Sequence, residues 1–108
     1  MKFSLLFTII VFISHTALAN DKLYVEGNTL YYNTDLAADD MNAEINWDDV
    51  DTIQEILLDN EEITIIQLNS SGGLLTAAQY ISDLVIDFEL DTYVSGECSS
   101  GCVDIFLA

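Results

Sequence analysis

The amino-acid sequence predicts a single α/β domain with parallel strands. Short apolar runs rich in β-branched residues alternate along the chain with segments whose apolar residues recur at helical spacing. Strand, helix, strand and helix in this order favour parallel strands joined by helical crossovers. A length of 108 residues fits one domain, and an apolar content of 51% excludes a disordered acidic tail.

The first predicted element is a β-hairpin. Leu23–Glu26 and Thr29–Tyr32 are rich in strand-forming residues, and they flank Gly27-Asn28, a pair typical of a tight turn. The tyrosines of this hairpin are expected in the core and in cross-strand pairs rather than in a ligand platform. The polar, small-residue stretch over 33–46 predicts mainly loop.

A helix is predicted next, over Trp47–Asp59. Three of its early residues are acidic, and the dipole of a helix favours anions in its first turn. Trp47 is expected to pack into the core. The predicted buried stripe consists of Val50, Ile53, Ile56 and Leu57.

A buried strand and a long amphipathic helix follow. Ile63–Leu68 is a continuous β-branched run, typical of a strand buried on both faces, and residues 69–73 interrupt it. Helical spacing then predicts a helix over 74–88. Its apolar stripe is Leu74, Ala77, Ala78, Ile81, Leu84, Val85 and Phe88.

The last predicted elements are a strand over Asp91–Ser95, a turn rich in Gly, Ser and Cys, and a helical segment over Val103–Ala108. The final residues are apolar and lack a helix cap. We therefore expect the chain to be the N-terminal part of a longer domain, with an incomplete core.

Met1–Ala19 has the pattern of a secretory signal peptide. Lys2 precedes the apolar run Phe3–Ile13, and Ala17-Leu18-Ala19 predicts cleavage before Asn20. The apolar run is shorter than the roughly 20 residues that a membrane span needs. We expect an exported protein, periplasmic or secreted, that is free of the membrane after cleavage.

Cleavage would leave residues 20–108, with all 19 acidic residues, Lys22 as the only base and no histidine. The formal net charge of −17 for the whole chain excludes binding to nucleic acid through a basic patch. The acidic stretches over 39–44 and 48–51 lack the glycine of an EF-hand loop, and solvated surfaces are the favoured interpretation. We predict no metal site and no cofactor.

Two glycine-serine turns are the candidate chemical site. Asn69–Gly73 and Gly96–Cys102 each follow a predicted strand and precede a predicted helix, so their backbone N–H groups are available to an oxyanion. Each turn by itself is also ordinary capping sequence. The G-x-S-x-G nucleophile motif is absent.

Cys98 and Cys102 are the only cysteines, and in an exported protein a disulfide is favoured over two buried thiols. In a regular helix, Cβ atoms at this spacing lie about 5–6 Å apart, whereas a disulfide requires roughly 3.5–4.5 Å. The bridge therefore needs Cys98 in the turn rather than in the helix. Two thiolates without histidine fall short of a zinc site.

Taken together, the two turns resemble the Clp protease proteolytic subunit and its crotonase-like superfamily. The likeness covers about residues 23–108, is most specific over 63–108, and is closest to exported relatives with a Cys two residues either side of the serine. It implies the ββα spiral fold of Clp protease and crotonase, truncated after the helix that follows the nucleophile begins. In that family an Asn-Ser-Pro-Gly-Gly loop forms the oxyanion hole.

The resemblance implies that Ser100 is the nucleophile, with the N–H groups of Gly72 or Gly73 and of Gly101 as the oxyanion hole. Here Ser71 replaces the usual Pro, and Gly101-Cys102 replaces the usual Met-Gly. The family's His and Asp lie beyond the last residue. Some relatives use a Lys base, and the position of Lys22 near the new N-terminus argues against that role.

We therefore expect an exported serine hydrolase acting on peptide or protein substrates, with homo-oligomerisation implied by the resemblance. The 108-residue chain itself should not hydrolyse substrate, because a serine needs a base within hydrogen-bond reach. The alternative is a non-catalytic binding or assembly domain on the same scaffold. An acyl-CoA enzyme of the superfamily is disfavoured by export.

Overall fold

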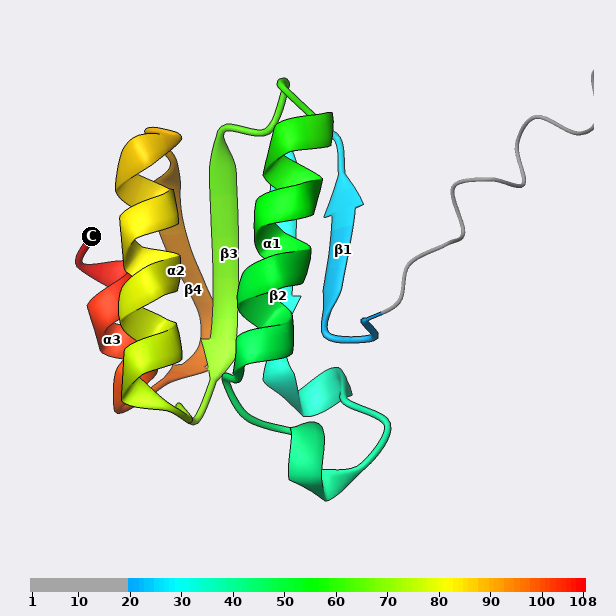
Figure 1. Cartoon of the computed structure of the whole chain (residues 1–108), viewed down its shortest axis with the longest axis vertical. Coiled ribbons are helices and arrows are strands. Elements are labelled where there is room, and N and C mark those ends of the chain that lie inside the picture. The colour runs from blue at the N-terminus through cyan, green and yellow to red at the C-terminus, as the bar shows by residue number, and fades with distance from the viewer. Residues whose placement is uncertain (1–19) are drawn as a thin grey trace, which may run out of the picture.

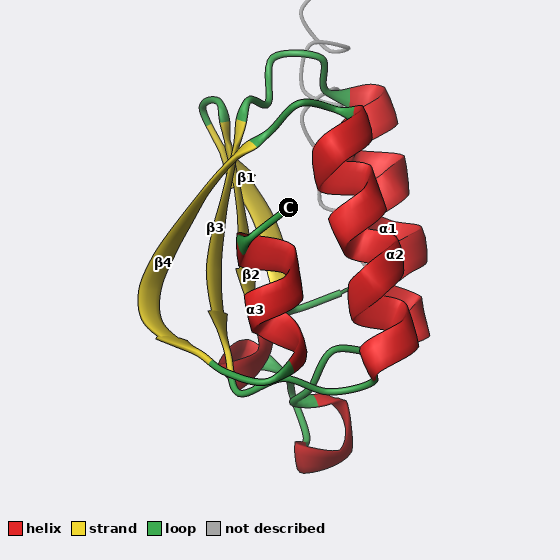
Figure 2. Ribbon diagram, turned by 90° about the vertical axis from the view of Figure 1, so that its left-hand side faces the viewer, coloured by secondary structure: helices red, strands yellow, loops and turns green. Residues whose placement is uncertain are grey.

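The computed structural model describes residues 20–108, so the predicted signal peptide lies outside the described residues. One four-stranded sheet, in the order β1-β2-β3-β4, is covered by helices on one side (Figures 1 and 2). The predicted α/β class with parallel pairing is confirmed, since β2, β3 and β4 run parallel. Within residues 20–108, no helix combines the length and apolarity needed to cross a bilayer.

The predicted hairpin is present. β1 (Leu23–Glu26) and β2 (Thr29–Asn33) pair antiparallel around a turn in which Gly27 has a φ of 61°. Tyr24 and Tyr31 lie opposite each other and stack with ring centroids 4.7 Å apart, which confirms the predicted cross-strand pairing. Tyr32 points to the other face of the sheet and is buried in the core.

The connection after β2 consists of two short 3₁₀ turns, Thr34–Leu36 and Asp40–Asn42, and then α1 (Trp47–Asp59), as predicted. A capping box starts α1, because Asn46 and Asp49 each accept the other's backbone N–H. The predicted burial of Trp47 is wrong. Its side chain is 43% exposed and packs edge-on against Tyr80, with the ring centroids 5.2 Å apart.

β3 (Ile65–Ser70) and β4 (Asp91–Cys98) both extend further than predicted at their carboxyl ends. The prediction that β3 is buried on both faces is wrong. Its residues alternate between buried and half-buried, because the helices cover only one side of the sheet (Figure 2). The half-buried positions lie on the uncovered face.

α2 (Leu75–Asp87) and α3 (Gly101–Phe106) complete the fold. α3 begins and ends two residues earlier than predicted. Leu74, predicted in the buried stripe of α2, is 44% exposed because it is the N-cap residue and lies outside the helix. A Cβ on Gly101 would lie 3.1 Å from the Cβ of Ala78, so small residues set how closely α3 approaches α2.

The core fills the space between the sheet and the helices, and its largest fully buried apolar side chains are Leu23, Leu30, Tyr32, Ile45, Ile53, Ile66, Leu68, Ile81, Ile105 and Val85. The parallel strands β2, β3 and β4 end at the same edge of the sheet, the lower end in Figure 1. Ligand sites of α/β sheets form beyond the carboxyl ends of strands. Both glycine-serine turns leave the sheet at this edge.

Candidate functional site

The two glycine-serine turns are in direct contact. A Cβ built on Gly72 would lie 2.8 Å from the Cβ of Ser100 and 3.0 Å from the carbonyl oxygen of Ser99. Gly72 also has a φ of 114°, a backbone conformation that residues other than glycine rarely adopt. The structure therefore brings together the two turns that the sequence singled out, and only glycine fits at their point of contact.

Ser100 occupies an unusual backbone conformation between β4 and α3. Its φ is 54° and its ψ is −125°, and its exposed side chain does not cap the helix that follows. A non-glycine residue held in this region costs about 1–3 kcal/mol and persists where the surrounding structure enforces it. A strained serine at a sharp strand-to-helix turn is the conformation of a nucleophile elbow, here without the G-x-S-x-G motif.

The amides near Ser100 differ in availability. The N–H of Gly72 donates to the Oγ of Ser70 at 3.0 Å. Gly73 forms a parallel bridge with Ile45 that uses the carbonyl of Gly72 and the N–H of Leu74, so the N–H of Gly73 points away from Ile45. Of the two glycine donors that the resemblance implies, Gly73 is the one whose amide is not used by its own loop.

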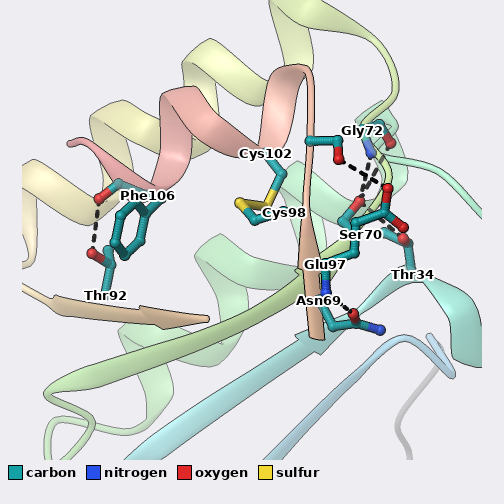
Figure 3. Close-up of a disulfide and its surroundings, with 10 residues drawn as sticks. Thr34, Asn69, Ser70, Gly72, Thr92, Glu97, Cys98, Cys102 and Phe106 are labelled. Atoms are coloured by element: carbon teal, nitrogen blue, oxygen red, sulfur yellow. Dashed lines mark hydrogen bonds between the residues drawn. A yellow bond between two sulfur atoms is a disulfide. The ribbon is translucent and has the colours of Figure 1, made fainter. Parts of the chain in front are cut away.

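Ser70 was missed by the sequence reasoning and holds the glycine loop in place. Its hydroxyl is buried, accepts from the N–H of Gly72 and accepts from the hydroxyl of Thr34 at 2.9 Å (Figure 3). Thr34 follows β2, so this buried pair ties the end of β2 to the loop after β3. The sequence signal that could have revealed its burial is the alternation of inward and outward residues along a strand. Ser70 follows Ile66 and Leu68 at intervals of two residues and is buried like them.

The predicted disulfide is present and encloses Ser100. The sulfurs of Cys98 and Cys102 are 2.09 Å apart and their Cα atoms 5.2 Å apart (Figure 3). Cys98 ends β4, whereas Cys102 lies in α3, so the two are not on one helix and the geometric objection to the bridge does not apply. The bridge closes a ring from residue 98 to residue 102 with Ser100 at its centre.

Lys22 has a structural role and is not placed to act as a base. Its buried ammonium lies 2.8 Å from a carboxylate oxygen of Asp49 and donates to the carbonyls of Asn42 and Glu44 at 2.7 and 2.8 Å. An ammonium with three acceptors has no free lone pair to receive a proton from serine. This placement agrees with the expectation that Lys22 does not act on Ser100.

Asp49 corrects the interpretation of residues 48–51 as a solvated acidic surface. Its carboxylate is fully buried and binds the ammonium of Lys22, the hydroxyl of Tyr32 and the amide of Asn20. Desolvation, followed by the charge and hydrogen bond of Asp49, raises the pKa of Tyr32 far above its ordinary value. This cluster joins the hairpin to α1 and is a structural centre.

The part of the chain that the structure describes contains no histidine. Among the same residues, no three side chains of His, Cys, Asp or Glu are grouped so that they could hold a metal ion. Comparisons with family models, curated protein sequences and solved structures found no match to this chain.

Proposed function

We propose that this chain carries the nucleophile and the oxyanion donors of an exported serine hydrolase of the Clp protease type, on a crotonase-like ββα scaffold. The observation that carries the proposal is the positive-φ conformation of Ser100, packed against Gly72. Three features surround it at short range: the glycine loop, the buried Ser70–Thr34 pair and the disulfide. Each restricts the turn that presents the hydroxyl.

The proposed reaction is acyl transfer from a peptide. The Oγ of Ser100 forms a bond to the peptide carbonyl carbon, and the negative oxygen is stabilised by the N–H groups of Gly73 and Gly101. The carbon–nitrogen bond then breaks, and the serine proton passes through a base to the leaving amine. Water hydrolyses the ester and regenerates the serine. Residues 20–108 contain no histidine, and the ammonium of Lys22 is held by Asp49 and two backbone carbonyls. The resemblance assigns the base to a His and Asp downstream of Ser100.

Chemical rescue with imidazole tests this proposal. A fluorophosphonate probe should label residues 20–108 negligibly in buffer, because the serine proton has no acceptor. Free imidazole supplies a base of suitable pKa, and a positioned general base is worth about 10²–10⁴-fold. We expect a smaller but clear acceleration, as the serine oxygen bonds to phosphorus, fluoride leaves and imidazole takes the proton. Mass spectrometry of the labelled peptide gives the site.

Ser100→Ala should abolish the imidazole-dependent labelling. Ser99→Ala is the matched control, because Ser99 is the neighbouring hydroxyl and bonds to the carboxylate of Glu97 at 2.9 Å. Labelling that persists in Ser100→Ala, or that never appears above the rate of a free serine peptide, would overturn the proposal. Hydrolysis of a peptide by the unassisted chain would contradict the assignment of the base to residues outside 20–108.

A second candidate function is a non-catalytic binding or assembly domain, favoured by the uncovered face of the sheet (Figure 2). Tyr24, Tyr31, Gln67 and Tyr93 form one row across all four strands by register. Tyr93 is 56% exposed although it is a large aromatic side chain. This function is favoured if Ser100 stays unreactive with imidazole and if sedimentation reveals an oligomer that Tyr93→Lys dissociates.

A further inference from the structure

The pairing of β3 with β4 is interrupted directly before the Ser100 turn. Leu68 pairs with Val94, and the next pair is Ser70 with Cys98. One residue of β3, Asn69, therefore faces three residues of β4, which are residues 95–97. A bulge of this kind bends the strand and redirects the residues that follow it. Here those residues are the disulfide turn.

The side chain of Asn69 bridges the interruption (Figure 3). Its Oδ1 accepts the backbone N–H of Glu97 at 2.8 Å, on β4. Its Nδ2 donates to the Oδ1 of Asn33, the last residue of β2, at 2.8 Å and to a carboxylate oxygen of Asp35, in the 3₁₀ turn that follows, at 3.0 Å. The amide thus spans three strands, with its oxygen toward β4 and its nitrogen toward β2.

Gly96 makes room for this amide. A Cβ at position 96 would lie 2.3 Å from the Oδ1 of Asn69, and Gly96 has a φ of 106°. Any other residue at position 96 would displace the amide oxygen from the N–H of Glu97. Pairing with β3 resumes after the bulge, where the N–H of Ser99 donates to the carbonyl of Ser70 at 3.1 Å.

We propose that Asn69 is the positioning residue for the Ser100 turn. By holding Glu97, it sets where β4 leaves the sheet and hence where residues 98–102 are placed against Gly72. The role of Asn69 toward a nucleophile rests on the function proposed above, whereas its control of the turn does not. Aspartate cannot replace it, because a carboxylate has no donor for Asn33 and would face the carboxylate of Asp35.

The disulfide next to Glu97 provides a readout that is independent of hydrolysis. When the turn is held, the two thiols of the reduced chain stay close and re-form the bridge readily. Asn69→Asp should shift the equilibrium with dithiothreitol toward the dithiol by about fivefold or more, the factor that corresponds to about one lost hydrogen bond. The exchange of the Glu97 amide with deuterium should accelerate in the same variant.

The double variant Asn69→Asp/Asp35→Asn tests the assignment by rescue. It restores a donor facing a carboxylate between positions 69 and 35, but not the donor to Asn33, so it should recover part of the shift in the disulfide equilibrium. Asn60→Ala is the matched control, because it removes another asparagine donor, bonded to the carbonyl of Ile56 at 2.7 Å, at the opposite end of β3. That variant should leave the equilibrium within about twofold of the wild type.

An equal shift in Asn69→Asp and Asn60→Ala, or no shift in Asn69→Asp, would overturn the proposal. The rate of imidazole-dependent labelling of Ser100, measured on the same variants, should follow the disulfide equilibrium. If the wild-type chain is never labelled, the hydrolase proposal fails by itself. The rescue of the disulfide equilibrium would then still decide whether Asn69 positions the turn.

Discussion

At three residues of the site, the conformation or burial depends on contacts between segments that are distant in the sequence. Ser100 has a positive φ without being glycine, Gly72 excludes any side chain because Ser100 is there, and the buried hydroxyl of Ser70 accepts the N–H of Gly72. The sequence alone already indicated Ser100 and Gly72 as candidate site residues. The conformation of Ser100 could not be predicted, because it depends on where α3 and the glycine loop meet.

The buried ion pair of Lys22 and Asp49 is the most consequential pair of single residues for stability. Asp49→Asn should destabilise the chain by about 3–5 kcal/mol, because it leaves the buried ammonium of Lys22 without its counter-charge. Urea unfolding followed by circular dichroism measures this loss. Asp48→Asn is the matched control, since Asp48 is the exposed neighbour in the same helical turn. Its expected effect is below about 1 kcal/mol, and equal losses in both variants would refute the assignment.

The helices and strands were predictable in type and order, and their ends were less so. α1 matches its predicted range because a capping residue and an acidic first turn mark its start. β3 continues to Ser70, and β4 continues through Gly96 to Cys98, because backbone pairing and the amide of Asn69 extend the sheet there. Local residue preferences cannot predict where a strand ends when its last residues pair with another strand.

The disulfide should stabilise one element, the turn between β4 and α3, more than the fold as a whole. The ring it closes is short, with a sequence separation of four, and short loops lose little entropy on closure. We expect reduction, or Cys98→Ser with Cys102→Ser, to change the free energy of unfolding by no more than about 2–3 kcal/mol. The amides of residues 97–103 should lose protection from hydrogen exchange. Unfolding of the whole sheet on reduction would contradict this expectation.

At the scale of the whole molecule, export is the prediction with the widest consequences. Expression of the full chain in a host with a signal peptidase should yield an exported form, periplasmic or secreted, that begins at Asn20, with the disulfide formed. Intact mass spectrometry tests both points, because the bridge lowers the mass by two hydrogens. Ala19→Arg should block cleavage and retain the precursor. A mature form that begins at another residue would contradict the predicted cleavage site.

The sequence by itself determined the fold class, the order of strands and helices and the two turns that meet in the site. These follow from periodicity, β-branched runs and glycine placement, which are local properties. Only the tertiary structure decided that Ser70 and Asp49 are buried, that Asn69 joins three strands and that Ser100 adopts a positive φ. Those features depend on which groups become neighbours after folding, since burial and hydrogen bonding between distant segments set their energies.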